Sequence, residues 1–126
     1  MRSLLDTTRR PDVTIRPDGC IEISAHAARA LALRRGDVID VCADRGELYL
    51  YVRHRAPTVG RHEAAAFPTH RRSNHFRAWS GRLCRAVTQN LGADNNVTLK
   101  LYAGETVSLP AFGAALPLIH KHTQTP

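Results

Sequence analysis

Arginine is the residue type whose spacing first suggests a chemistry in this chain of 126 residues. Residues 53–85 contain eight arginines and a single acidic residue, Glu63, so this segment alone carries the formal net charge of +7. Residues 1–52 and 86–126 are each neutral. Because guanidinium groups match phosphate oxygens in charge and geometry, the segment favours contact with a polyanion. Phe67, Phe76 and Trp79 interleave with the charges and are suited to stacking on bases.

The candidate binding residues come from the N-terminal arm, the first expected hairpin and helix, and the basic segment. We predict nucleic-acid contacts by Arg9, Arg10, Arg16, Arg29, Arg71, Arg72 and Arg77. For the first four, the alternative is an ordinary solvated surface arginine. For the segment as a whole, the alternatives are a flexible, solvated linker or a surface for an acidic protein partner.

Other chemistry has little support in the sequence. There is no G-x-S-x-G, no phosphate-binding glycine loop and no H-E-x-x-H, so we predict no catalytic site and no cofactor. His70 and His75 are spaced like a ligand pair, but no cysteine or carboxylate accompanies them in the pattern of structural zinc, and we predict no metal site. The three cysteines include no C-x-x-C pair and are expected to be free thiols.

The elements that would position these arginines begin with residues 12–55. Apolar residues alternate over 13–15 and 20–23 around the turn "PDG", which predicts a hairpin. Ser24 is a candidate N-cap for a short helix, and "RRGD" is expected to end that helix, with Gly36 in the left-handed cap position. Two further runs, "VIDVCAD" and "LYLYVRH", predict strands on either side of a turn at "RGE". The expected order is strand, strand, helix, strand, strand.

The ordered pattern within this region resembles the swapped-hairpin module of AbrB, MazE and SpoVT-type proteins. The positions that match the family are Gly19, Ile21, Ile23, Leu31, Leu33, Gly36, Asp37, Ile39 and Val41. The resemblance implies an intertwined homodimer with a small shared barrel, which commonly serves as a DNA-binding transcriptional regulator or an antitoxin. The chain departs from the usual pattern at Cys20, Ser24, Ala28 and Ala32, so the family's DNA-contacting positions are only partly filled.

The rest of the chain divides into two regions. Residues 56–78 contain prolines and little periodicity, and are expected to form a basic linker or loop. Residues 79–126 are expected to form a helix, capped by Ser80 and ended by Gly92, followed by a hairpin. With a module at residues 1–55, the predicted fold class is mainly β with short helices (α+β). It comprises a swapped-hairpin β-barrel module formed by a dimer, plus a C-terminal helix-hairpin region.

The function expected from these features is that of a DNA-binding transcriptional regulator acting as a homodimer. One alternative is an antitoxin-like or assembly protein that binds a partner protein through residues 53–126. Another is an RNA-binding protein. The N-terminus "MRSLLDTTRR" does not have the apolar run of a signal peptide, and no apolar stretch is long enough to span a bilayer. We therefore expect a soluble, cytoplasmic protein that does not bind membranes.

Overall fold

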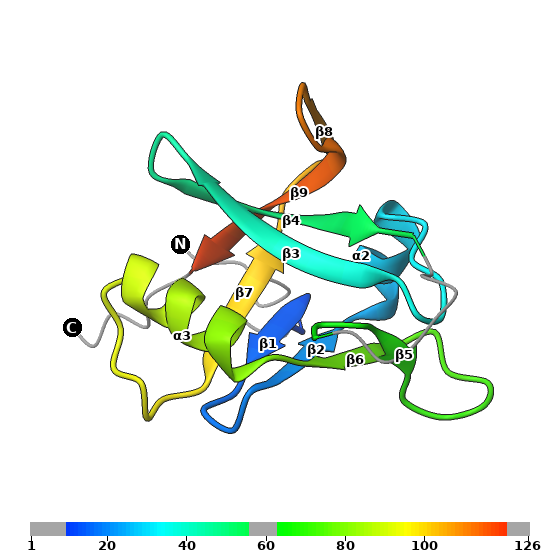
Figure 1. Ribbon diagram of the computed structural model, residues 1–126, viewed down its shortest axis with the longest axis horizontal. Helices are drawn as coiled ribbons and strands as arrows, with labels where there is room; N and C mark the ends of the chain where they lie inside the picture. The colour runs from blue at the N-terminus through cyan, green and yellow to red at the C-terminus, as the bar shows by residue number, and fades with distance from the viewer. Residues whose placement is uncertain (1–9, 56–62, 121–126) are drawn as a thin grey trace, which may run out of the picture.

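The computed structural model describes residues 10–55 and 63–120, which form a curled antiparallel sheet with two short helices (Figure 1). The first part of the chain forms β1 (Val13–Ile15), β2 (Cys20–Ile23), α2 (Ala25–Ala30), β3 (Val38–Asp44) and β4 (Glu47–His54). The second part forms β5 (Phe67–Pro68), β6 (Phe76–Trp79), α3 (Gly81–Asn90), β7 (Leu99–Ala103), β8 (Val107–Leu109) and β9 (Gly113–His120). The strands are ordered β3-β4-β9-β7-β1-β2-β6-β5, with β8 paired to β9.

Local sequence signals account for the elements of the first part. Val13 and Ile15 face the core, as do Ile21 and Ile23, which is the alternation expected of half-buried strands. Gly19 adopts a φ of 95° in the turn between β1 and β2, where a Cβ would come within 3.1 Å of the backbone nitrogen of Gly81. Glycine is therefore required there both for its backbone conformation and for the close approach to α3.

Both helices begin at the serines predicted to cap them. The amide of Ala27 donates to the Ser24 hydroxyl at 3.1 Å, and the amide of Leu83 donates to the Ser80 hydroxyl at 3.0 Å. Each bond satisfies a backbone N–H that the first turn of a helix leaves without a helical partner. Gly92, with a φ of 67°, follows α3 as predicted.

The same order of strands and helix occurs twice along the chain. β1–β2–α2–β3–β4 is followed by β5–β6–α3–β7–β9, with β8 as an addition. Equivalent strands of the two halves lie side by side, since β2 pairs with β6 and β4 with β9. The first strand of one half also pairs with the third strand of the other. β1 pairs with β7, and Ala65, just before β5, bridges to Val38 of β3.

The core lies inside this curled sheet and is mostly aliphatic. The largest fully buried side chains come from both halves and include Ile15, Ile39, Leu50, Leu101 and Leu116. Asp12 joins three elements at the edge of this core. Its Oδ1 accepts from the Ser24 hydroxyl at 2.9 Å, and its Oδ2 accepts from the amide of Ala103 at 2.8 Å.

The predicted fold class is wrong. A single chain forms a mostly antiparallel half-barrel, and β7 and β9 of residues 79–126 insert between β1 and β4, where the expected dimer would have placed a partner's strand. For the same reason there is no separate C-terminal helix-hairpin region among the described residues, because these strands belong to the common sheet. Alternation along a strand reveals which face is buried but not which strand lies beside it.

The middle of the chain also differs from the expected linker. Residues 56–62 lie outside the described part, but β5 and β6 lie within 63–79 and extend the sheet beyond β2. Phe76 and Ala78 of β6 are buried, whereas Arg77 and Trp79 are exposed. Buried and exposed residues therefore alternate along β6, but Arg77 and Trp79 in the exposed positions do not give the apolar–polar alternation by which a strand is recognised in a sequence.

Candidate functional site

The hairpin of β5 and β6 places aromatic and basic side chains on one exposed face. Arg77 and Trp79 point outward from β6 because residues two apart in a strand share a face. Phe67 of β5 lies directly opposite Arg77 in the strand register. Phe67 and Trp79 are 37% and 55% exposed, which is unusual for large aromatic side chains and calls for an explanation.

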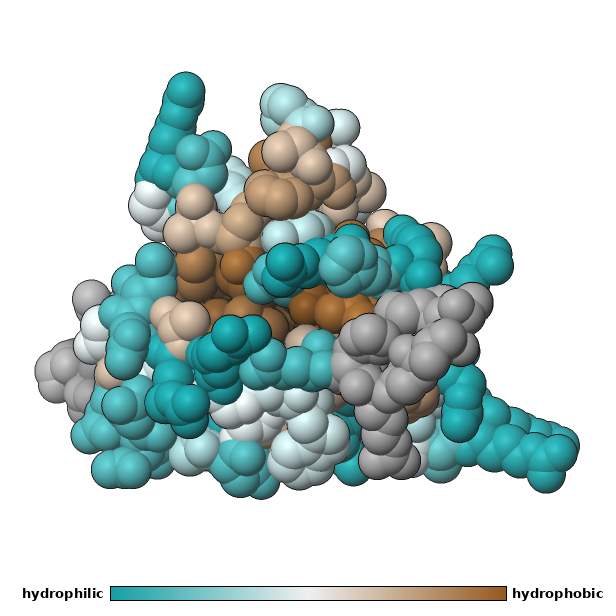
Figure 2. Space-filling view, in the orientation of Figure 1, coloured by the Kyte–Doolittle hydropathy of each residue, from teal (hydrophilic) through white to brown (hydrophobic). Residues whose placement is uncertain are grey.

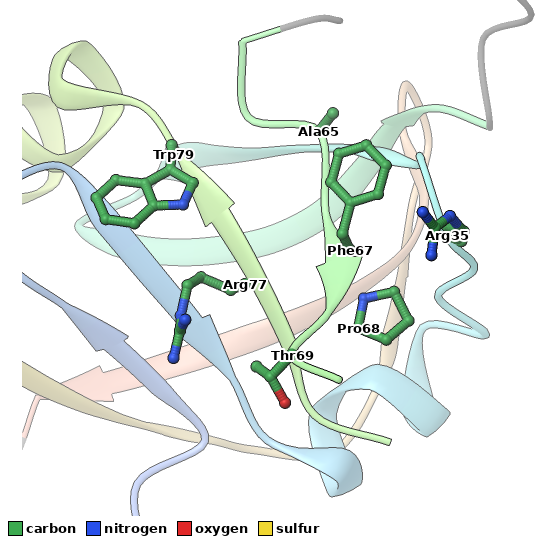
Figure 3. Close-up of a pocket in the computed structure, with 7 residues that line it drawn as sticks. All are labelled: Arg35, Ala65, Phe67, Pro68, Thr69, Arg77 and Trp79. Carbon is green, nitrogen blue, oxygen red and sulfur yellow. The ribbon is translucent and has the colours of Figure 1, made fainter. Parts of the chain in front are cut away.

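These side chains line a groove of about 690 Å³, whose lining residues are Arg35, Ala65, Phe67, Pro68, Thr69, Arg77 and Trp79. Figure 3 shows the indole of Trp79 and the ring of Phe67 on opposite sides of this aromatic groove, with Arg77 next to Trp79. The guanidinium carbon of Arg35 is 5.5 Å from the centre of the Phe67 ring, within the range of a cation–π contact.

The acidic residue opposite Arg77 in the sheet, Glu22, forms an ion pair with a different arginine. Glu22 faces Arg77 across the β2–β6 pair, but its Oε1 accepts from Nε of Arg16 at 2.6 Å. This ion pair raises the pKa of Arg16. Within the described part of the chain, no carboxylate lies within 4.0 Å of the Arg77 guanidinium, so its donors are available to a ligand.

Two smaller hollows adjoin the same hairpin and bring further arginines to it. One, of about 320 Å³, is lined by Arg29, Arg34 and Ser73, so the turn between β5 and β6 lies against the end of α2. The other, of about 190 Å³, is lined by Arg10, Thr69 and His75. We call the arginines around the hairpin and its turn the arginine surface: Arg10, Arg29, Arg34, Arg35, Arg71, Arg72 and Arg77. All seven are exposed.

A buried carboxylate holds the loop that carries Arg34 and Arg35. Oδ2 of Asp37, which is fully buried, accepts from the backbone amide of Arg34 at 2.8 Å and from Nη1 of Arg55 at 3.0 Å. Arg55 also donates to the backbone carbonyls of Leu31 and Ala32. The connection from α2 to β3 is therefore fixed from both sides, which positions Arg35 beside the aromatic groove.

A further hollow, of about 360 Å³, lies between β3 and α3, next to the β-bridge that pairs Val38 with Ala65. Its lining combines apolar side chains, including Val41, Leu83 and Ala86, with charged ones, Asp40, Arg53, Glu63 and Arg82. Figure 2 shows hydrophobic side chains in the middle of this face, framed by hydrophilic ones. We call this hollow the β3–α3 hollow.

The described residues offer no activated thiol and no metal cluster. Burial raises the pKa of Cys20 and of Cys42, and it raises the pKa of Cys84 to about 11. The thiols are therefore protonated at neutral pH and poor nucleophiles. Within residues 10–55 and 63–120, no group of three or more His, Cys, Asp or Glu side chains is arranged to hold a metal ion. None of the described helices is long and apolar enough to cross a membrane.

Five of the seven arginines predicted from the sequence lie in or around the β5–β6 hairpin: Arg77 lines the aromatic groove, Arg10 and Arg29 line the two adjoining hollows, and Arg71 and Arg72 belong to the turn. Arg16 is instead paired with Glu22, and Arg9 lies outside the described residues. Sequence analysis missed Arg34 and Arg35. Their signal was the "RRGD" stretch, which was interpreted only as the end of a helix.

A comparison of the sequence and the structure with protein-family models, curated proteins and solved structures found no match.

Proposed function

We propose that this protein binds nucleic acid through the arginine surface. The observation that carries the proposal is that arginines from distant parts of the chain lie around the β5–β6 hairpin: Arg35 and Arg77 line the aromatic groove, and the others line an adjoining hollow or lie in the turn of the hairpin. Arg29, Arg34 and Arg35 come from the first half of the fold, whereas Arg71, Arg72 and Arg77 come from the second. Arginines gathered in this way neutralise successive phosphates of a nucleic-acid backbone, and exposed aromatic rings beside them suit contact with bases.

The sequence-based form of this proposal is a DNA-binding transcriptional regulator, and the resemblance to AbrB-type proteins supports that form. A homodimer would present two copies of the arginine surface, which favours a site with two-fold symmetry. Binding to RNA depends on the same phosphate contacts, so the first experiment should include both polymers.

The experiment is a fluorescence-anisotropy titration of duplex DNA, single-stranded DNA and RNA at several salt concentrations. We expect a measurable affinity at low salt that falls steeply as salt rises, because phosphate contacts release counterions. The mass of the free protein, measured alongside, reports the oligomeric state. Absence of binding to all three polymers at low salt would refute the proposal.

A second candidate function, binding of a partner protein, is favoured by the β3–α3 hollow, which offers both apolar and charged side chains beside the edge of β3. β3 pairs with β4 on one side, and on its other side the described residues 64–66 cover only its beginning. Among residues 10–55 and 63–120, no strand pairs with the edge next to Val41, and an extended segment of a partner placed there would gain backbone hydrogen bonds and apolar contacts. This candidate predicts a complex of fixed stoichiometry that Ala86→Arg disrupts and Arg77→Gln leaves intact.

A further inference from the structure

We propose that the aromatic groove binds the unpaired bases of a single-stranded nucleic acid by stacking, with Trp79 and Phe67 as the platforms. This inference rests on the proposed function and makes it more specific. Phosphate contacts by arginine do not require an aromatic ring, and duplex DNA does not offer base faces for stacking. The two exposed rings therefore point to a ligand whose bases are accessible.

The position of the rings supports this assignment. Phe67 belongs to β5 and Trp79 to β6, and these two strands are paired, with Phe67 opposite Arg77. On its other side β6 pairs with β2, where Trp79 lies opposite Cys20. The two rings therefore come from adjacent strands, and both line the groove. A sheet surface with outward aromatic residues is a rigid platform where the alternate residues of the strand are buried, as they are in β6, which carries Trp79. Phe76 and Ala78 fix β6 in this way.

The charge around the rings supports it as well. Arg35 contacts Phe67, and Figure 3 shows Arg35 on the side of that ring turned away from Trp79. The Phe67 side chain is still 37% exposed, so part of its ring remains accessible to a ligand. Arg77 lines the same groove and can bind a phosphate next to a stacked base, and Arg71 and Arg72 add exposed positive charge in the turn between β5 and β6.

The size of the groove is compatible with this ligand. Its volume of about 690 Å³ falls within the range of about 300–1,000 Å³ that is common for organic ligands. Ala65 and Pro68 contribute apolar surface to its lining, which suits the face of a base. The groove thus joins apolar surface, two rings and two guanidinium groups in one place.

The chain contains a built-in reporter for the test. Trp79 is the single tryptophan, so intrinsic tryptophan fluorescence reports on the groove alone. The probe is a thymidine homopolymer of about 12 nucleotides, within the usual site size of single-strand-binding domains. A uridine homopolymer of the same length tests RNA. Two controls of the same length are an abasic strand, which keeps the phosphates but lacks bases, and a mixed-sequence duplex.

The expected result is quenching of Trp79 fluorescence by either homopolymer and weaker binding of the abasic strand. Trp79→Ala and Phe67→Ala should each weaken homopolymer binding by about 5- to 100-fold, the cost of losing one stacked base. Trp79→Phe should retain most of the affinity, because a smaller ring still stacks. Phe112→Ala, which removes a similarly exposed ring outside the groove, should have little effect.

Two results would overturn the inference in distinguishable ways. If the abasic strand or the duplex binds as tightly as the homopolymers and Trp79 fluorescence is unchanged, the protein contacts phosphates alone. The stacking site is then refuted, while the proposed function stands. If none of the four polymers binds at low salt, the proposed function fails, and the stacking site fails with it. Circular dichroism of each variant confirms that it is folded, which is expected because both rings lie outside the core.

Discussion

Neutralising three arginines of the arginine surface should change how nucleic-acid affinity depends on salt. The change is Arg71→Gln, Arg72→Gln and Arg77→Gln in one variant. All three side chains are exposed, and within the described residues no carboxylate lies within 4.0 Å of any of them. Glutamine keeps most of the length and polarity of the side chain, so the variant loses charge with little effect on the core.

The magnitude follows from the number of phosphates contacted. For a single strand, the slope of log affinity against log salt is about −0.7 for each phosphate neutralised. Seven arginines that each meet a phosphate give a slope of about −5, and the loss of three leaves about −3. Between 50 and 200 mM salt, the affinity of the wild-type protein should therefore fall by about 1,000-fold and that of the variant by about 50-fold.

The assay is fluorescence anisotropy with a labelled thymidine homopolymer, repeated over that range of salt. A control variant, Arg45→Gln with Arg85→Gln, removes exposed arginines from the β3–β4 turn and from α3, which lie away from the β5–β6 hairpin in Figure 1. The slope should become shallower in the triple variant and change much less for each arginine removed in the control. An equal change for each arginine in both variants would refute a localised arginine surface, because the net charge alone would then explain the binding.

Three predictions concern the scaffold. Asp12→Ala should lower the free energy of unfolding in urea by about 1–3 kcal/mol, since the buried amide of Ala103 loses its acceptor; a smaller loss would contradict the role of Asp12 as an anchor. The hydrogen bond from Ser80 and the hydrogen bond from Arg82 lower the pKa of Glu63 below its ordinary value of 4.5. The ionised Glu63 therefore stabilises the fold at pH values above 4.5, and this stabilisation is lost as the pH falls through the lowered pKa. Glu63→Gln should therefore lower the Tm at neutral pH, and the difference from the wild-type protein should shrink in acid; a difference independent of pH would argue against the ion pair. Cys84, whose pKa is raised to about 11, should resist alkylation at neutral pH until the protein is unfolded, and mass spectrometry of the alkylated protein would reveal any exception.

Several features of the fold could be predicted from the sequence because they depend on neighbours along the chain. Alternation predicted β1 and β2, and serine followed by an apolar helix predicted both N-caps. The turn at Gly19 was also correctly predicted, since a positive φ is a local requirement that glycine meets. The concentration of arginine between residues 53 and 85 can be read directly from the sequence.

The pairing of the strands could not be predicted in the same way. β1 pairs with β7 across more than 80 residues of chain, and nothing near either strand specifies the other. The sequence-based prediction supplied the missing strand from a second molecule, whereas the chain supplies it from its own second half. Long-range pairing depends on how all the strands share one core, which is a property of the whole fold.

For the arginine surface, too, some features could be predicted from the sequence and others depend on the tertiary structure. The sequence by itself determined that the chain is basic, where the excess charge lies, and where β1–β4 and both helix N-caps form, but not β5 and β6, because composition and local periodicity depend only on adjacent residues. Only the tertiary structure decided that Arg35 joins Arg77 beside two exposed rings, that Arg34 and Arg29 line the adjoining hollow, and that Arg16 is paired with Glu22. Those relations arise when the curled sheet brings the end of α2 against the β5–β6 hairpin, residues that are about forty positions apart in the chain.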